Sequence, residues 1–337
     1  MQIKRTTSFL LCGLALLTSL PAFCLGQSSS DENAAVVKFD FNLKRMRSNQ
    51  MVKNAGVADM LENSGAIPSG ALGSLEIKKV DRIYGGLQAP NNTSDLTALD
   101  PTQDLPINFF VRVEFADADA ANSMIDLIKQ DGTEHEINGK TYYGPPGGQI
   151  PNVRAHLVDD KTFEIGTSDY VTGSDRNVFS KALVANWEKL SKNDAIRISI
   201  DVTGMQDVFN EGMDMARQQT PPEMLGMVEL GSNLAGLSIG IDIDSDTMLT
   251  LIAYGKDSEG AENIKDGLNG MLALAKMQAQ QGMAMLEEDQ QAAAKQVMNA
   301  LKAQSEGNAV MIKIPKPDGF EEIIGGMLQG GGPGSGF

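Results

Sequence analysis

Cysteine and histidine are scarce in this chain, and their positions exclude several kinds of chemistry. The two cysteines, Cys12 and Cys24, lie near the amino terminus, and the two histidines are His135 and His156. Neither histidine has a second one a helical turn away, as a helical zinc site needs, and no nucleophile-elbow motif accompanies them. The sequence therefore predicts no catalytic residue, no metal site and no cofactor.

Aromatic residues and positive charge are also in short supply. Aromatic residues make up 5% of the chain, with a single tryptophan, so sugar-stacking platforms are few. The formal net charge of -16 opposes contact with phosphate backbones, which excludes nucleic acid as a partner. A hydrolase that uses carboxylates alone stays open as an alternative, because 44 acidic residues offer many possible pairs.

Long apolar runs are absent except at the start of the chain. Lys4 and Arg5 precede an apolar run at 9–20, and the small residue Ala22 follows it. This pattern is typical of a secretory signal peptide, here 1–26, and the run is shorter than the roughly 20 residues of a membrane span. We expect export to the periplasm or beyond the cell, with no transmembrane segment.

The leader contains both thiols. Cleavage after Ala22, Cys24 or Gly26 would leave at most one cysteine, so no internal disulfide is expected. A lipid anchor at Cys24 is the minor alternative, because Phe23 and Pro21 stand where a lipid-modified cysteine usually has a small residue and a leucine.

After a polar linker at 27–34, the first half of the mature chain alternates strand and helix patterns. Strands are expected at 36–41, 74–84 and 107–115, and helices at 44–63 and 117–130. Asp117 is the predicted N-cap of the second helix, and the Pro- and Asn-rich stretch 88–106 predicts a long loop.

The middle of the chain is predicted to be mostly β. A strand at 134–144 leads into a Gly- and Pro-forced turn, and a hairpin follows at 153–158 and 162–167. A helix is expected at 175–191, because Leu183 and Trp187 recur at helical spacing.

The pattern then restarts. Strands are expected at 195–202, 234–243, 247–255 and 308–314. Helices are expected at 204–218, 257–281, onward from the break at Gly282 to about 304, and at 318–328. The Gly-rich tail at 329–337 is expected to be disordered.

This order predicts an α+β fold with an internal duplication. Strand–helix–strand–strand–helix–strand occurs twice, and Phe39 aligns with Ile200 while Asp117 aligns with Asp257. Two βαββαβ (ferredoxin-like) units would place helices on one face of each sheet. They would either cover each other or join edges into one larger, mostly antiparallel sheet. The units are 35–192, with the hairpin and a helix inserted, and 193–328.

Three of these features give the chain a resemblance to known proteins. The strand at 36–41, the helix that begins at Asp117 and the hairpin at 153–167 resemble a group of uncharacterised secreted proteins of planctomycete-type bacteria. The resemblance spans about 36–315 without a sharp motif. It implies bacterial export, attaches no activity and carries over no functional residue.

The stretch 242–246 has the acidic spacing that begins a calcium loop. The remaining loop positions hold Thr247 and Ala253, where glycine and an acid are needed. We therefore predict a turn between two strands.

Methionine is abundant, with 18 residues gathered mainly in the second half. Clustered thioethers can bind copper(I), line a groove for a peptide or apolar ligand, or fill a core. No histidine or cysteine lies nearby to complete a copper site. The candidate groove residues are Met271, Met277, Met283 and Met298.

From these observations we expect an exported, non-catalytic structural or interaction protein of the cell envelope, with an unidentified envelope protein or peptide as partner. The alternatives are a periplasmic carrier or chaperone that binds through the Met-rich helices, and a carboxylate-based hydrolase.

Overall fold

The structure is a computed structural model of the whole chain. It describes residues 34–49, 53, 77–88, 108–144, 152–173, 179–206, 209–210, 213–214, 217, 230–283 and 288–318. The expected signal peptide, the loop at 88–106 except its first residue, most of the helix at 44–63, the forced turn, the helix at 318–328 and the tail lie outside these residues.

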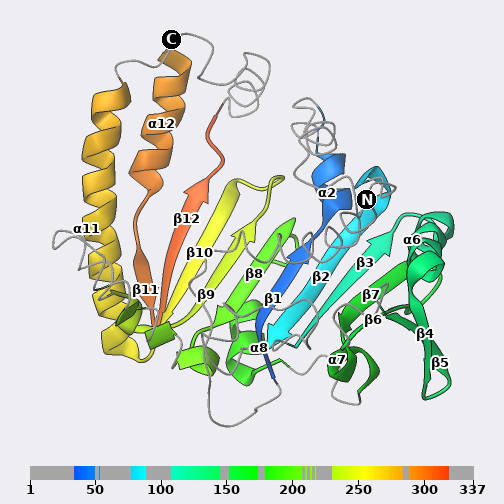
Figure 1. The fold of residues 1–337 in the computed structure, drawn as a ribbon. Coiled ribbons are helices and arrows are strands. Elements are labelled where there is room, and N and C mark those ends of the chain that lie inside the picture. Colours follow the sequence, from blue (N-terminus) through cyan, green and yellow to red (C-terminus); the bar gives the residue numbers. More distant parts are fainter. Residues whose placement is uncertain are drawn as a thin grey trace.

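A single sheet of 12 strands forms the body of the protein (Figure 1). Its strands are β1 (Ala35–Phe41), β2 (Val80–Gln88), β3 (Phe109–Phe115), β4 (Thr133–Ile137), β5 (Lys140–Gly144), β6 (Val153–Leu157), β7 (Thr162–Thr167), β8 (Ile196–Asp201), β9 (Leu234–Ile241), β10 (Thr247–Gly255), β11 (Gln304–Glu306) and β12 (Ala309–Pro315). They lie in the order β11-β12-β10-β9-β8-β1-β2-β3-β7-β6-β5-β4. The neighbouring pairs are antiparallel, which confirms an α+β fold with a large antiparallel sheet.

Helices of different lengths connect these strands. They are α2 (Leu43–Ser48), α6 (Ala118–Asp131), α7 (Ser168–Thr172), α8 (Lys181–Trp187), α11 (Ser258–Met283) and α12 (Glu288–Ala300), with 3-10 turns η1 (Ile77–Lys79) and η3 (Thr203–Met205). Asp117 caps α6 as expected, because its side chain accepts a hydrogen bond from the backbone N–H of Ala120 at 2.8 Å. Within the described ranges, no helix combines the length and apolar composition that crossing a bilayer requires.

The two faces of the sheet differ in polarity because the strands alternate apolar and polar residues. Phe39, Ile198 and Leu251 share one face through the pairing of β1, β8, β9 and β10, and we call it the apolar face. Lys38 and Arg197 lie on the opposite, polar face.

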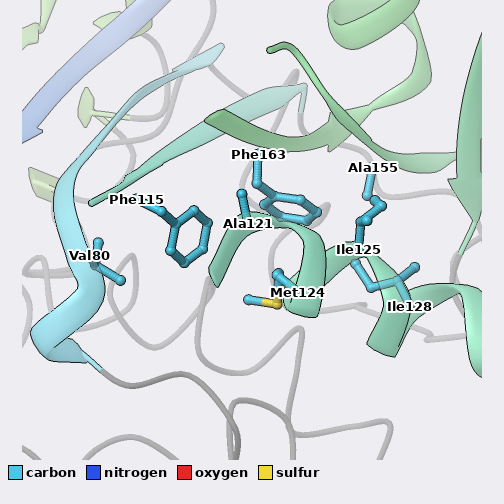
Figure 2. Close-up of a cluster of buried hydrophobic side chains, with 8 residues drawn as sticks. All are labelled: Val80, Phe115, Ala121, Met124, Ile125, Ile128, Ala155 and Phe163. Carbon is cyan, nitrogen blue, oxygen red and sulfur yellow. The ribbon is translucent and has the colours of Figure 1, made fainter. Parts of the chain in front are cut away.

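Buried clusters fix helices to the apolar face. Figure 2 shows α6 presenting Met124 and Ile125 to Phe163 of β7 and Phe115 of β3. At the other end of the sheet, α11 places Ile264 and neighbouring apolar residues against β10 and β12. Burial of these side chains supplies the main stabilisation of each helix, at about 25 cal/mol per Å² of apolar surface.

Helices also cover the polar face, so the expectation of helices on one face is wrong. Trp187 and Leu190, at and after the end of α8, pack with Ile252 and Tyr254. Ile252 lies opposite Ser238, which in turn lies opposite Ser199, so these residues share the face of Lys38. The amphipathic spacing in α8 predicted a buried stripe but could not indicate which face of the sheet would receive it.

The strand order also corrects the ferredoxin-like pairing. A split βαβ unit separates its first two strands by another strand, whereas β1 pairs directly with β2 and Phe39 lies opposite Gly85. β1, β2 and β3 form a simple meander, and β7 returns to pair with β3. β8, β9 and β10 form a second meander, to which β12 returns. The last strand of the first half is therefore β7, within the predicted hairpin, and not the strand expected at 134–144.

Two further expectations were wrong in detail. The strand expected at 134–144 is a hairpin of β4 and β5, because Asn138 and Gly139 adopt φ values of 53° and 72° and turn the chain. The strand expected at 74–84 is β2, which starts later, after the 3-10 turn η1, and continues through Gly85 to Gln88.

Candidate functional site

A hollow of about 220 Å³ opens on the polar face, over β1, β2, β3 and β8. We call it the central hollow. It is lined by Lys38, Phe39, Asp40, Arg82, Tyr84, Gly85, Phe110, Phe179, Trp187 and Arg197. The hollow thus combines aromatic rings, three cations and one carboxylate.

The floor of the central hollow follows from the alternation within the strands. Lys38 and Asp40 lie on the polar face of β1, two residues apart. Asp40 lies opposite Tyr84 of β2 on one side and opposite Arg197 of β8 on the other. Long-range pairing of three strands therefore places oppositely charged side chains side by side, where they can form ion pairs.

One wall consists of Phe179 and the helix α8. The backbone N–H of Ser180 donates to the carbonyl of Ala35 at 3.1 Å, which holds this segment against β1. The Ser180 hydroxyl caps α8 by accepting from the backbone N–H of Leu183 at 3.1 Å. Leu183 is fully buried, and Trp187, one turn further along the helix, faces the hollow.

Two glycines let the aromatic walls approach the floor. A Cβ atom on Gly85 would fall on the carbonyl oxygen of Phe110, and a Cβ atom on Gly86 would lie 2.7 Å from a ring carbon of Phe179. Larger residues would force the neighbouring strand or the ring to move. Gly86 thus explains how β2 runs beneath the ring of Phe179, and Gly85 lets β2 pack closely against the backbone of β3.

Among the described residues, Asp40 is the only carboxylate that lines the central hollow, and two arginines bind it. Arg82 donates to its two oxygens from Nε at 2.7 Å and from Nη2 at 2.8 Å, and Arg197 donates from Nη2. Burial alone would raise the pKa of Asp40, but the hydrogen bonds from Arg82 and Arg197 hold it below its usual value. Asp40 is therefore ionised and already paired.

Lys38 has a different environment, because its ammonium contacts rings and no acceptor. Its Nζ lies 4.6 Å from the ring centroid of Phe179 and 4.6 Å from that of Trp187. Among the described residues, no carboxylate or carbonyl oxygen accepts a hydrogen bond from this nitrogen. Burial lowers the pKa of Lys38, and the positive charge of Arg197 lowers it further.

The guanidinium of Arg197 adds to this excess of positive charge. It lies 4.5 Å from the ring centroid of Trp187, and its Nε is buried without an acceptor among the described residues. Among the lining residues, Arg82, Arg197 and Lys38 carry three positive charges against the single negative charge of Asp40. Two carboxylates outside the lining, Glu114 at 3.7 Å from Arg82 and Glu188 near Lys38, offset part of this excess. The hollow is therefore locally cationic in a protein whose net charge is -16.

A second buried ionic group lies beside the hollow on the polar face. Arg112 is ion-paired through Nε to Glu164, a side chain with only 2% of its surface exposed. His156 Nε2 lies 3.7 Å from the other oxygen of Glu164. Cation–π contact of Arg112 with the ring of Tyr84, at 5.9 Å, connects this group to the wall of the central hollow.

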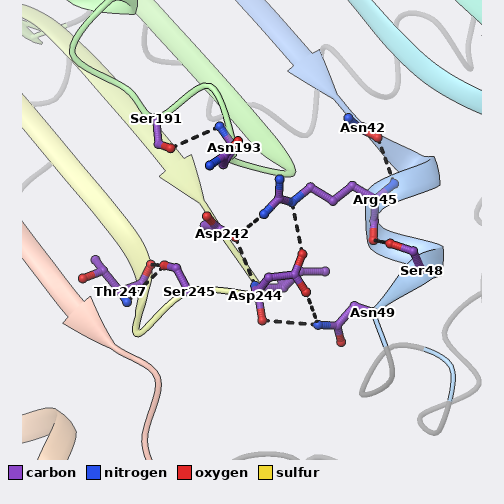
Figure 3. A network of polar contacts seen from close by, with 11 residues as sticks. Asn42, Arg45, Ser48, Asn49, Ser191, Asn193, Asp242, Asp244, Ser245 and Thr247 are labelled. Carbon is purple, nitrogen blue, oxygen red and sulfur yellow. Dashed lines mark hydrogen bonds and ion pairs between the residues drawn. The ribbon is translucent and has the colours of Figure 1, made fainter.

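The acidic stretch at 242–246 forms a turn held by an arginine, as Figure 3 shows. Arg45 of α2 donates to Asp242 at 3.1 Å and lies 3.2 Å from an oxygen of Asp244. The amide of Asn49 donates to the other oxygen of Asp244 at 2.7 Å. The carboxylates thus fasten α2 to the β9–β10 turn. Among the described residues, no group of three or more acidic, histidine or cysteine side chains is placed to hold a metal ion.

Asp194 lies near this network and is buried without full pairing. Only 8% of its surface is exposed, and its Oδ2 has no hydrogen-bond partner among the described residues. Burial, together with the negative charge of Asp242, raises the pKa of Asp194 to about 6. Asp194 is therefore a carboxyl group that titrates near neutral pH.

The four candidate groove methionines lie on the α11–α12 hairpin. Met271, Met283 and Met298 are half-buried, and Met277 is 56% exposed. None of the four lines the central hollow. The buried cluster beneath α11 uses Ile264 and other aliphatic residues in their place.

Sequence reasoning missed the residues of the central hollow, except that Trp187 was placed on a helix face. Lys38, Arg82 and Arg197 each occupy a polar position in an alternating strand, which is the usual pattern of a solvent-exposed face. The signal that could have found them is this cationic alternation together with Gly86, because a glycine at that position leaves room for an aromatic ring over the polar face.

Comparisons with known proteins give no family. No protein-family model matches the chain, and no curated protein matches it. Similar solved structures include three of TP0453. Crystal form I is 12% identical, with 86% of this chain and 90% of that chain covered and a TM-score of 0.38. Form IV is 11% identical, with 88% and 93% covered and a TM-score of 0.40. Form III is 10% identical, with 90% and 96% covered and a TM-score of 0.39. At these values the likeness carries no argument about this chain.

Proposed function

We propose that this chain is an exported, non-catalytic interaction protein of the cell envelope, and that the central hollow is its ligand-binding site. The observation that carries the proposal is the position of Lys38. Its ammonium lies between the rings of Phe179 and Trp187 and has no acceptor among the described residues. A concave site with aromatic walls and a few convergent polar groups is the usual form of a small-molecule site.

The same geometry disfavours the carboxylate-based hydrolase. Glycoside hydrolysis, for example, needs two carboxyl groups across the scissile bond, and the described lining of the hollow contains one, Asp40. The bonds from Arg82 and Arg197 keep Asp40 ionised, and its lowered pKa makes it a poor proton donor or acceptor near neutral pH. A non-catalytic role uses Asp40 to position the two guanidinium groups.

A carrier that binds through a Met-rich groove is the weaker alternative. Met277 is largely exposed, and Leu274 beside it on α11 is 58% exposed, so this surface is convex helix and not the lining of a described pocket. The central hollow, in contrast, is concave. If the protein is a carrier, its cargo belongs there.

We further propose that the two halves arose by duplication. The sequence alignment pairs Phe39 with Ile200 and Val37 with Ile198, and in the sheet Phe39 lies opposite Ile198 while Val37 lies opposite Ile200. A two-fold axis through the Lys38–Ser199 pair would therefore exchange the two strands. Lys38 lies on this axis, so the hollow sits where the halves meet.

A thermal-shift screen tests the proposed function. The mature chain is heated with separate sets of small anionic, neutral and cationic compounds. A ligand of the hollow raises the melting temperature by an amount that grows with its concentration relative to its Kd. The substitution Trp187→Leu removes the wall and should abolish the shift, whereas Met277→Leu on α11 should keep it. No shift from any set, or a shift lost only in the Met277 variant, would contradict the proposal.

A further inference from the structure

We infer that the ligand of the central hollow is a small organic carboxylate with a flat, unsaturated body. This inference rests on the proposed function and adds the chemical class of the ligand. Three properties of the hollow carry it, namely its charge, its walls and its size.

The positive charge of the hollow favours an anionic ligand. Lys38, Arg82 and Arg197 outnumber Asp40 by three to one, and the two arginines already share that carboxylate. Lys38 lies near the cations Arg197 and Arg82 and near the carboxylates Asp40 and Glu188, but among the described residues no group accepts a hydrogen bond from its ammonium. An anion near Lys38 would replace lost hydration with a charge-assisted hydrogen bond and would relieve its repulsion from Arg197.

The aromatic walls of the hollow favour a ligand with a planar, unsaturated body. Phe179, Trp187, Phe110 and Tyr84 surround the floor with rings, and cations lie over several of them: Lys38 over Phe179 and Trp187, Arg197 over Trp187 and Arg82 over Tyr84. A planar carboxylate bound to these cations would also contact the rings. A bare anion such as inorganic phosphate would use the charges and make no apolar contact with the rings. A body that lies against the rings uses both features of the site.

The size of the hollow sets an upper limit. Its volume of about 220 Å³ lies below the range of about 300–1,000 Å³ that holds drug-sized ligands. A single ring with one carboxylate fits this limit, whereas a nucleotide or a peptide exceeds it.

Isothermal titration calorimetry of the mature chain tests the inference with three probes: benzoate, its neutral counterpart benzamide, and inorganic phosphate. We expect benzoate to bind at least about tenfold more tightly than either comparison compound, since one charge-assisted hydrogen bond accounts for a factor of that order. Equal binding of benzamide would show that charge is not recognised. Equal binding of phosphate would show that the rings are not used. Either result overturns the inference and leaves the proposed function intact.

Absence of binding by all three probes would likewise overturn the inference, whereas the proposed function fails only if no compound set raises the melting temperature. Three variants locate the site. Lys38→Met keeps an unbranched side chain between the rings and should lose benzoate affinity about tenfold or more while its benzamide affinity stays unchanged. Lys38→Arg keeps the charge and should retain benzoate binding, which protects the test if the Met variant fails to fold. Lys192→Met, at an exposed site on the same loop as Asp194, should bind as the wild type does. Unchanged benzoate affinity in a folded Lys38→Met variant would contradict the inference.

Discussion

The ammonium of Lys38 lies 4.6 Å from the centroid of the Trp187 ring, above the middle of the sheet. Lys38 belongs to β1, whereas Trp187 belongs to α8, which follows β1, β2, β3 and β7 in the chain. Contact with the ring stabilises the ammonium by about 1–2 kcal/mol but does not satisfy its hydrogen-bonding capacity. A lysine held in this way is available to an incoming anion.

Substitution of Asp40 by Asn should destabilise the protein strongly. Asn cannot accept hydrogen bonds at both positions that Arg82 and Arg197 use, so positive charges would face one another within the floor. Breaking a buried pair of this kind costs about 3–5 kcal/mol. Urea unfolding measures the cost. The control is Asp126→Asn. The Asp126 side chain is 65% exposed and is paired with Lys129, so this substitution should change stability by less than about 1 kcal/mol. A similar small effect at Asp40 would show that the ion pairs of the floor contribute little.

Gly85 and Gly270 should respond in opposite directions to substitution by alanine. A Cβ atom at Gly85 would collide with the backbone of Phe110, so Gly85→Ala should cost about 1–3 kcal/mol. Gly270 lies within α11 with open space around it, so Gly270→Ala should stabilise the protein by about 0.5–1 kcal/mol. The two free energies of unfolding, compared by urea titration, check the packing of β2 against β3. A stable Gly85→Ala variant would mean that these strands lie further apart than the structure places them.

Asp194→Asn should stabilise the protein at neutral pH and not in acid. The pKa of Asp194 rises from 3.8 to about 6 on folding, so the native state binds the proton more tightly than the unfolded chain. The stability that this group contributes is complete below about pH 4 and is lost as pH rises through about 6. The Asn side chain does not titrate, so the variant does not lose this stability as the pH rises. Its melting temperature should exceed that of the wild type at about pH 8, and the difference should vanish at about pH 4. A difference independent of pH would show that Asp194 is not the titrating group.

The local alternation of residues allowed much of the fold to be predicted. Strands such as 36–41 and the hairpin at 153–167 were expected from period-two patterns, and Asp117 was expected as a cap from its place before an apolar helix. The pairing of β1 with both β2 and β8 was not predictable, because it depends on contacts between residues far apart in the chain, such as Asp40 with Arg197. The central hollow depends on that pairing.

Two predicted strand boundaries were wrong at positions near glycine. The strand expected at 74–84 ended before Gly85 and Gly86, since glycine is disfavoured in strands. In the structure β2 continues through both, because only glycine leaves room for Phe110 and Phe179. The Asn138–Gly139 pair was a turn signal that the strand expected at 134–144 passed over.

Collisional quenching of Trp187 fluorescence tests the cationic hollow most directly, because Trp187 is the only tryptophan in the chain. Iodide and caesium are compared at low salt, where local charge controls the approach of an ion. A net charge of -16 alone would repel iodide and attract caesium. The charges of Lys38, Arg82 and Arg197 around the indole predict the reverse. Iodide should quench more strongly than caesium, and Lys38→Met should reduce the ratio. Stronger quenching by caesium, or no quenching by either ion, would contradict an open cationic hollow at Trp187.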